Sequence, residues 1–232
     1  MASDGEQPER QNYPVDTAGD STLSIVLFLT VLALFAQVAV RLLRATDARR
    51  SFPWLAVVLG LAVGIPSLLQ FAVPAVGDAL RRNPRLTVHD GQWWRILTAV
   101  AAQDGGLIGA VFTLAVLIAV VAVAQWIWGW RMTLLLFFVP SIVLNLLAVF
   151  AWNAPGGGSS FATDGLLASL CGLALVSLRD TIGRLCAALV VAIGVVLVAT
   201  GDAHGVAMLL GALLGALLGL SRARFRRSPR SS

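Results

Sequence analysis

The chain has 232 residues, of which 58% are hydrophobic and only 12% are charged. Soluble domains carry about 25% charged residues, so the composition excludes an ordinary soluble protein and indicates a polytopic membrane protein. The formal net charge of +5 comes entirely from arginine, and the arginines are scattered between apolar runs. This distribution argues against a nucleic-acid partner and favours membrane lipids with anionic headgroups.

Residues 1–21 are polar and acidic, which predicts a disordered tail. They lack the basic region of a secretory signal, so the first apolar run, 22–43, is expected to be a retained transmembrane helix. A second span is predicted over 54–76, with Pro66 as a kink that a helical bundle tolerates.

A long polar stretch, 77–98, separates this span from the next. It contains Trp94 and Arg95, and tryptophan suits the headgroup region because an apolar ring carries a polar N–H. We therefore expect Trp94 and Arg95 to anchor the chain at the membrane interface, with a contact to substrate as the alternative.

Five further spans are predicted over 105–126, 132–152, 164–178, 185–200 and 203–220, and a basic tail follows at 222–232. The segment 153–160 contains Pro155 and three consecutive glycines, which predicts a flexible loop. Arginines concentrate where a seven-span chain with its N-terminus outside would have its cytoplasmic segments. We predict a multi-pass protein of the cell membrane with a cytoplasmic C-terminus.

The last span begins with Asp202-Ala203-His204 and carries glycines at every fourth position, Gly211, Gly215 and Gly219. Ionisable residues at membrane depth are rare and often mark a functional site. The glycines reduce one helix face to backbone, so that another helix can pack close beside His204.

Cys171 and Cys186 both fall inside apolar runs. Their positions indicate small core residues rather than a disulfide framework, and the spacing of potential ligands does not suggest a metal site. No cofactor is predicted.

Several segments resemble the conserved motifs of rhomboid intramembrane proteases, in the same order along the chain. The strongest is the first-loop signature at 91–98, with the sequence GQWWRILT; the others are Arg82-Asn83-Pro84, Gly129-Trp130-Arg131, Asp164-Gly165, and Ala203-His204 with Gly211. The resemblance implies an all-α membrane fold, with a rhomboid-like six-helix core over 54–221 and one extra N-terminal transmembrane helix.

Rhomboids use a serine–histidine dyad within the membrane, and His204 matches the position of their base. The position of the nucleophile, however, holds Asp164. Two positions that would supply oxyanion donors hold Gly109 and Thr113. The resemblance therefore favours a pseudoprotease without activity that binds the transmembrane helices of client proteins, in which His204 is either an ion-pair partner of Asp164 or a structural histidine.

Two alternatives remain open. Ser160 lies four residues before Asp164, about one helical turn or roughly 5.4 Å away, and with His204 it would make an active intramembrane serine protease. The competing interpretation is that Ser159 and Ser160 are ordinary loop or capping residues. A third hypothesis is a proton-coupled transporter or channel built on Asp164, Asp202 and His204, although the sequence has no obvious inverted repeat.

Overall fold

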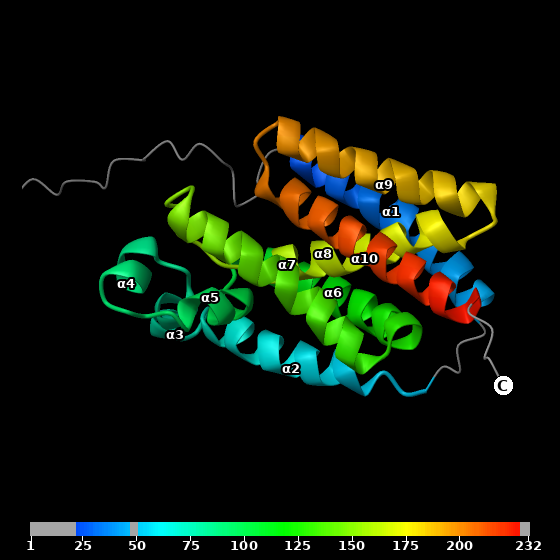
Figure 1. Cartoon of the computed structure of the whole chain (residues 1–232). Coiled ribbons are helices and arrows are strands. Elements are labelled where there is room, and N and C mark those ends of the chain that lie inside the picture. Colours follow the sequence, from blue (N-terminus) through cyan, green and yellow to red (C-terminus); the bar gives the residue numbers. More distant parts are fainter. Residues whose placement is uncertain (1–21, 47–50, 228–232) are drawn as a thin grey trace, which may run out of the picture.

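A computed structural model describes residues 22–46 and 51–227 (Figure 1). The predicted disordered tail, 1–21, and the end of the basic tail, 228–232, lie outside the described residues. Within the described part the regular elements are helices, and one isolated antiparallel bridge joins Arg82 to Gly156.

The chain runs through two groups of helices with a region of short helices between them. The elements are α1 (Thr22–Ala45), α2 (Trp54–Leu69), α3 (Pro74–Leu80), α4 (Pro84–Val88), α5 (Arg95–Thr98), a 3-10 turn (Ala99–Ala101), α6 (Gly106–Trp128), α7 (Trp130–Phe150), α8 (Ser160–Ser177), α9 (Thr181–Ala199) and α10 (Ala203–Arg227).

Among the described residues, six helices are long and apolar enough to cross a membrane, namely α1, α6, α7, α8, α9 and α10. The 16-residue α2 is also apolar but shorter. Their lengths fit the hydrocarbon thickness of a bilayer, which takes about 20 helical residues. The architecture is that of a multi-pass membrane protein, as the composition predicts.

The predicted second span is too long. Its helix ends at Leu69 instead of residue 76, and a turn leads to Pro74, which begins α3. Proline has no N–H to donate, and its ring fixes φ near the helical value, so it suits the first position of a new helix. Pro66 lies inside α2, as predicted.

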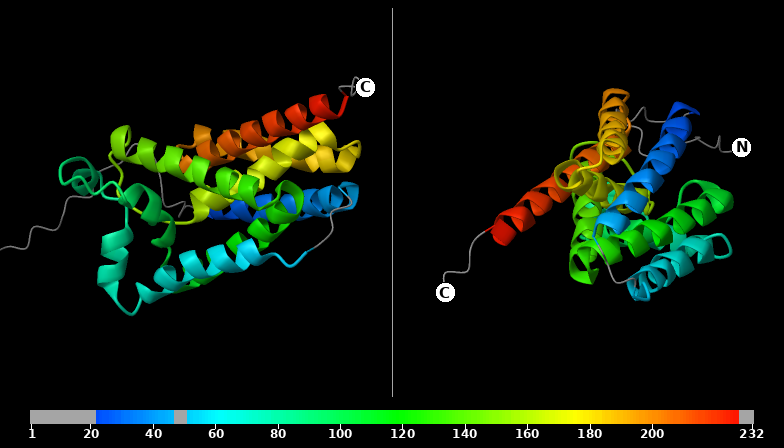
Figure 2. Two further views of the ribbon diagram at one scale, coloured as in Figure 1. Left: turned by 60° about the horizontal axis from the view of Figure 1, so that its bottom comes forward. Right: turned by 90° about the vertical axis from the view of Figure 1, so that its right-hand side faces the viewer.

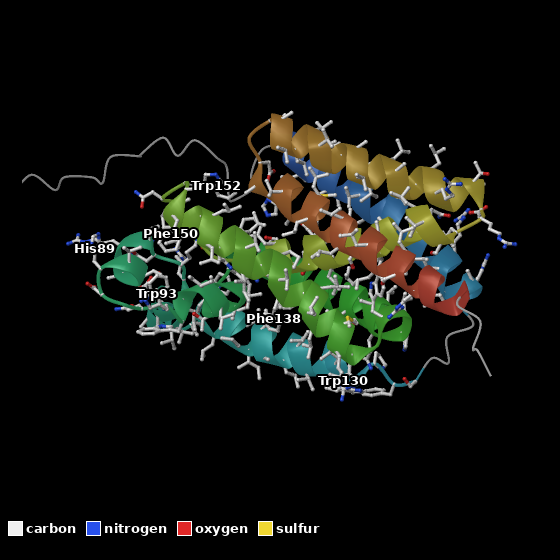
Figure 3. The ribbon with its side chains drawn as sticks, in the orientation of Figure 1. His89, Trp93, Trp130, Phe138, Phe150 and Trp152 are labelled. Atoms are coloured by element: carbon white, nitrogen blue, oxygen red, sulfur yellow. The ribbon has the colours of Figure 1, made fainter. Side chains whose placement is uncertain are left out.

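The polar stretch after the second span folds into α3, α4 and α5. Arg95 is buried there, and its guanidinium donates to the carbonyls of Asp78 and Arg81 at 2.6 and 2.7 Å. Trp94 is 54% exposed. Trp93 stacks on Phe150 with ring centroids 6.0 Å apart, on the same side of the molecule as α4 (Figure 3).

Helix α8 is the central helix of the bundle. It is buried without a break from Phe161 to Ala174, and the other long helices lie around it in both views of Figure 2. It packs most extensively against α10. Small residues make this close packing possible: a Cβ at Gly211 would collide with the Gly165 backbone, and one at Gly215 would collide with the Ser169 carbonyl.

Three helix ends differ most from the predicted spans. Helices α8 and α9 begin at Ser160 and Thr181, each four residues before the predicted starts at 164 and 185. Helix α10 continues to Arg227, so the first part of the predicted basic tail is helical. Arg222 lies over the Trp128 ring at 4.6 Å and donates to the carbonyls of Ile127 and Trp128. A cation at the end of α6 is favourable because the last carbonyls of a helix lack intrahelical partners.

Candidate active site

The start of α8 and the start of α10 bring Ser160 next to His204. The Ser160 hydroxyl lies 3.0 Å from His204 Nε2, although 44 residues separate them in the chain. Ser160 is the first residue of α8, and His204 is the second residue of α10. The close packing of these two helices along their small residues fixes the distance between their first turns.

Asp202 binds the other ring nitrogen of His204, Nδ1. Asp202 Oδ1 lies 2.6 Å from His204 Nδ1 and also accepts the backbone N–H of His204 at 2.9 Å. The Asp202 side chain is 5% exposed and that of His204 is 14% exposed. Asp202 thus caps the start of α10, as aspartate commonly does, and orients the ring with the same carboxylate.

These contacts determine the tautomer that suits the site. With Nδ1 protonated, the N–H donates to the Asp202 carboxylate, and Nε2 keeps a lone pair directed at Ser160. The ring of Phe161 covers the imidazole at 5.0 Å between centroids. A serine next to an oriented histidine base is the arrangement needed to generate an alkoxide nucleophile.

The loop before α8 is fixed by the buried side chain of Arg82. Its guanidinium donates to the Asn145 side chain and to the carbonyls of Ala154 and Pro155. The backbone of Arg82 also exchanges two hydrogen bonds with Gly156. Burial lowers the pKa of Arg82 to about 10, which leaves the guanidinium charged at neutral pH.

The glycines of this loop are tied to the neighbouring segment. The Gly157 N–H donates to Asp104 at 2.7 Å, and the Gly158 N–H donates to the Ala99 carbonyl at 2.9 Å. Asp104 is itself paired with Arg81. The segment predicted as a flexible loop is therefore anchored by hydrogen bonds just before Ser160, which positions the start of α8.

Two N–H donors lie near the Ser160 hydroxyl. The first N–H groups of a helix have no partner within it, and Ser160 is the first residue of α8. Gln103 adds a side-chain amide, whose Nε2 donates to the Ser159 hydroxyl at 3.3 Å. Preorganised donors of this kind stabilise the tetrahedral intermediates of acyl transfer.

A cavity of about 260 Å³ opens next to these groups, with walls from α1, α6, α8 and α10. Ser160, Asp202 and His204 are among the residues that line it. Gly109 and Thr113, the positions expected to lack oxyanion donors, also line it. The Thr113 hydroxyl donates to the Gly109 carbonyl within α6 at 2.8 Å, so it is already engaged.

Asp164 lines the same cavity one turn deeper on α8 than Ser160, and it is 2% exposed. The sequence analysis suggested His204 as the ion-pair partner of Asp164. In the structure the two ring nitrogens of His204 lie against Asp202 and Ser160 instead. The structure therefore brings Ser160 and His204 together and leaves Asp164 beside them.

The remaining predicted site residues lie elsewhere. Trp94 and Arg95 belong to the region of short helices and are not among the residues that line the cavity. Gly211 and Gly215 face α8, where they allow the close approach. In the described part of the chain, no group of three histidine, cysteine or acidic side chains has the arrangement of a metal site, and Cys171 and Cys186 are buried free thiols.

Sequence reasoning missed two features of this site. Asp202 was noted beside His204, but a partner two residues away is recognisable only when the start of α10 is known, because capping directs the carboxylate back at the ring. The contacts of Arg82 with Asn145 and of Gln103 with Ser159 join segments far apart in the sequence, and no local pattern indicates which residues pair. A scan against models of protein families and a search of curated proteins both find no match to this chain.

Proposed function

We propose that this chain is an intramembrane serine protease of the rhomboid type, with Ser160 as nucleophile and His204 as general base. One observation carries the proposal, which is the line of contacts from Ser160 through His204 to Asp202 at 3.0 and 2.6 Å. Serine is a weak nucleophile unless a positioned base removes its proton. The membrane-spanning helices around the site make peptide bonds in or near transmembrane helices the natural substrates.

The proposed reaction has two stages. The Ser160 hydroxyl attacks the carbonyl carbon of the substrate while its proton passes to His204 Nε2. That proton then moves to the amine nitrogen as the C–N bond breaks, which leaves an acyl ester on Ser160. Water attacks the ester with His204 again as the base, and the proton returns to the serine oxygen as the acid product leaves.

Asp202 supports these steps without reacting itself. It holds the imidazole with Nδ1 protonated, and its negative charge stabilises the imidazolium that forms in each stage. The Ser160 N–H and the Gln103 amide are the candidate donors for the oxyanion. The nucleophile of this proposal thus lies one turn before Asp164, the position that the rhomboid resemblance would assign.

A second candidate function is an inactive rhomboid-like protein that binds the transmembrane helices of clients. The observation that favours it is the lining of α6, where Gly109 has no side chain and the Thr113 hydroxyl is engaged with a backbone carbonyl. Weak stabilisation of the oxyanion would leave a binding protein with little hydrolysis.

Labelling by a fluorophosphonate probe separates the two functions, because the probe reacts only with an activated serine. We expect labelling of the wild-type protein in detergent and its loss in Ser160→Ala and in His204→Ala. Ser159→Ala is the matched control, since the neighbouring hydroxyl accepts from Gln103 and does not contact His204. Cleavage of a single-span substrate should follow the same pattern.

Wild-type protein that is folded, unlabelled and unable to cleave would reject the protease and leave the client-binding function. Equal labelling of wild-type and Ser160→Ala protein would assign the reaction to a different serine.

A further inference from the structure

The cavity beside Ser160 contains a buried carboxylate that the proposed reaction does not use. Asp164 follows Ser160 by four residues, so both side chains lie on one face of α8, and both line the cavity. Its deeper walls are largely apolar, with Phe112 and Val116 from α6 and Met208 from α10. Cavities of this kind, apolar with a few polar groups, are typical of ligand sites.

No hydrogen bond or ion pair joins the Asp164 side chain to another described residue, although Asp164 is only 2% exposed; the charges of His204 and Asp202 act on it at longer range. The other two carboxylates of the cavity are engaged, since Asp104 pairs with Arg81 and Asp202 holds His204. A buried carboxylate without a partner is costly, and ionisable residues within membranes are usually paired. Asp164 is therefore the cavity carboxylate that remains available to a bound cation.

The charge of the cavity indicates the chemistry of that molecule. Three carboxylates line it, Asp104, Asp164 and Asp202, and no arginine is among its described lining residues. Interactions between charges strengthen where water is excluded, so this cavity favours a cationic group and disfavours an anionic one.

We infer that Asp164 determines substrate specificity by binding the cationic side chain of the residue whose carbonyl carbon Ser160 attacks. The inference rests on the proposed function. The substrate residue is lysine or arginine: its methylene stem lies along the apolar walls, and its charged end reaches the carboxylate one turn below the nucleophile. An apolar side chain in the same place would leave Asp164 without a partner.

Binding of p-aminobenzamidine tests the recognition without any hydrolysis. This small cation fluoresces more strongly in an apolar site, and it would be titrated into Ser160→Ala protein in detergent. We expect Asp164→Asn in that background to weaken binding by at least about tenfold, as for loss of a charge-assisted pair. Asp104→Asn is the comparison variant: its carboxylate lines the same cavity but is paired with Arg81, so the substitution should weaken binding clearly less than Asp164→Asn does.

A comparison of ligands makes the test independent of any variant at Asp164. The uncharged analogue p-aminobenzamide should bind Ser160→Ala protein at least about tenfold more weakly than the amidine. Equal binding of the two ligands, or equal binding of the amidine with and without Asp164, would overturn the inference.

Cleavage then shows whether the recognition serves the reaction. Single-span substrates with arginine, leucine or glutamate before the scissile bond should be cleaved in that order, and Asp164→Asn should abolish the preference for arginine. Amidine binding that requires Asp164, in a protein that never labels at Ser160, would retain the cation site and reject the protease. Labelling at Ser160, in a protein whose amidine binding and substrate preference do not depend on Asp164, would retain the protease and reject the cation site.

Discussion

At the scale of single residues, Asp202 has two tasks that one substitution can separate. Asparagine is as good a helix cap as aspartate, so Asp202→Asn keeps the start of α10 but removes the charge behind His204. We expect the rate of labelling or cleavage to fall by about 10²–10⁴-fold, as when a histidine base loses its oriented tautomer.

The measurement is kcat and KM across pH, with the unfolding temperature as the control for structure. The fall should lie in kcat and leave KM little changed, because the Asp202 charge stabilises the imidazolium that forms during the reaction and does not bind the substrate. An unchanged kcat in a folded variant would assign Asp202 to capping alone.

Arg82 and Asn145 form a second residue-scale feature, one that supports the loop before Ser160. Asn145→Leu keeps the side-chain size but removes an acceptor from a buried guanidinium, and we expect it to lower the free energy of unfolding by about 3 kcal/mol. Thermal unfolding in detergent measures the loss. His89→Leu at the exposed end of α4 (Figure 3) is the control and should change the unfolding temperature little.

At the scale of elements, the packing of α8 against α10 sets the geometry of the site. A Cβ at Gly215 would meet the backbone of Ser169, whereas one at Gly219 would first meet the side chains of Val176 and Leu173. Side chains yield more easily than backbone, so we expect Gly215→Ala to lower stability by about 1–3 kcal/mol and Gly219→Ala to have a smaller effect.

Activity should report the same displacement. Moving α10 away from α8 separates His204 from Ser160, so labelling should fall in Gly215→Ala more than in Gly219→Ala. Equal stability and equal labelling of the two variants would show that the backbone contact does not control the site.

The link between α1 and the start of α9 is electrostatic and depends on pH. The Gly183 N–H and the Arg41 guanidinium lower the pKa of the Asp180 carboxyl. Because the folded pKa lies below the unfolded one, the pair stabilises the protein above the ordinary carboxyl pKa, and the contribution is lost as pH falls through the lowered value.

Asp180→Asn keeps a capping side chain and removes this dependence. The unfolding temperature of the wild type should exceed that of the variant at neutral pH by a small amount, since the pair is exposed. The difference should shrink in acid and in high salt. A difference that stays constant across pH would exclude the ion pair as its cause.

At the scale of the whole molecule, topology follows from the direction of the helices. If the N-terminus is outside and all seven apolar helices cross, the turn at Ser177 is cytoplasmic and the turn at Thr200 is external. We expect an impermeant maleimide to label Thr200→Cys on intact cells and to label Ser177→Cys only after lysis, in a background with Cys171 and Cys186 replaced by alanine. The opposite pattern would invert the orientation.

The sequence predicted the helices better than the site because they depend on different information. Long apolar runs and glycines at every fourth position are local patterns, and they yielded six long helices and the face of α10 that meets α8. The second span was too long because its apolar character continues across the turn before Pro74. The contact of Ser160 with His204 depends on where α8 begins. The fixed loop before it depends on Arg82, which belongs to a rhomboid-like motif but whose partners lie too far along the chain for a local pattern to identify.

Helix α1 supplies one wall of the cavity, with Ile25, Phe28 and Leu29 near its beginning, and Phe28 meets Phe112 of α6 edge-on at 6.2 Å. Its other end is buried in the bundle through Val38 and Leu42 and tied to Asp180 by Arg41. Helix α1 contacts both α9 and α6, so under the proposed function a polypeptide that reaches Ser160 from the side of α1 would displace its first turns while the rest stays bound. Helix α1 and the substrate helix would then compete for the same surface. The rate of turnover would depend on how tightly the first turns of α1 pack there.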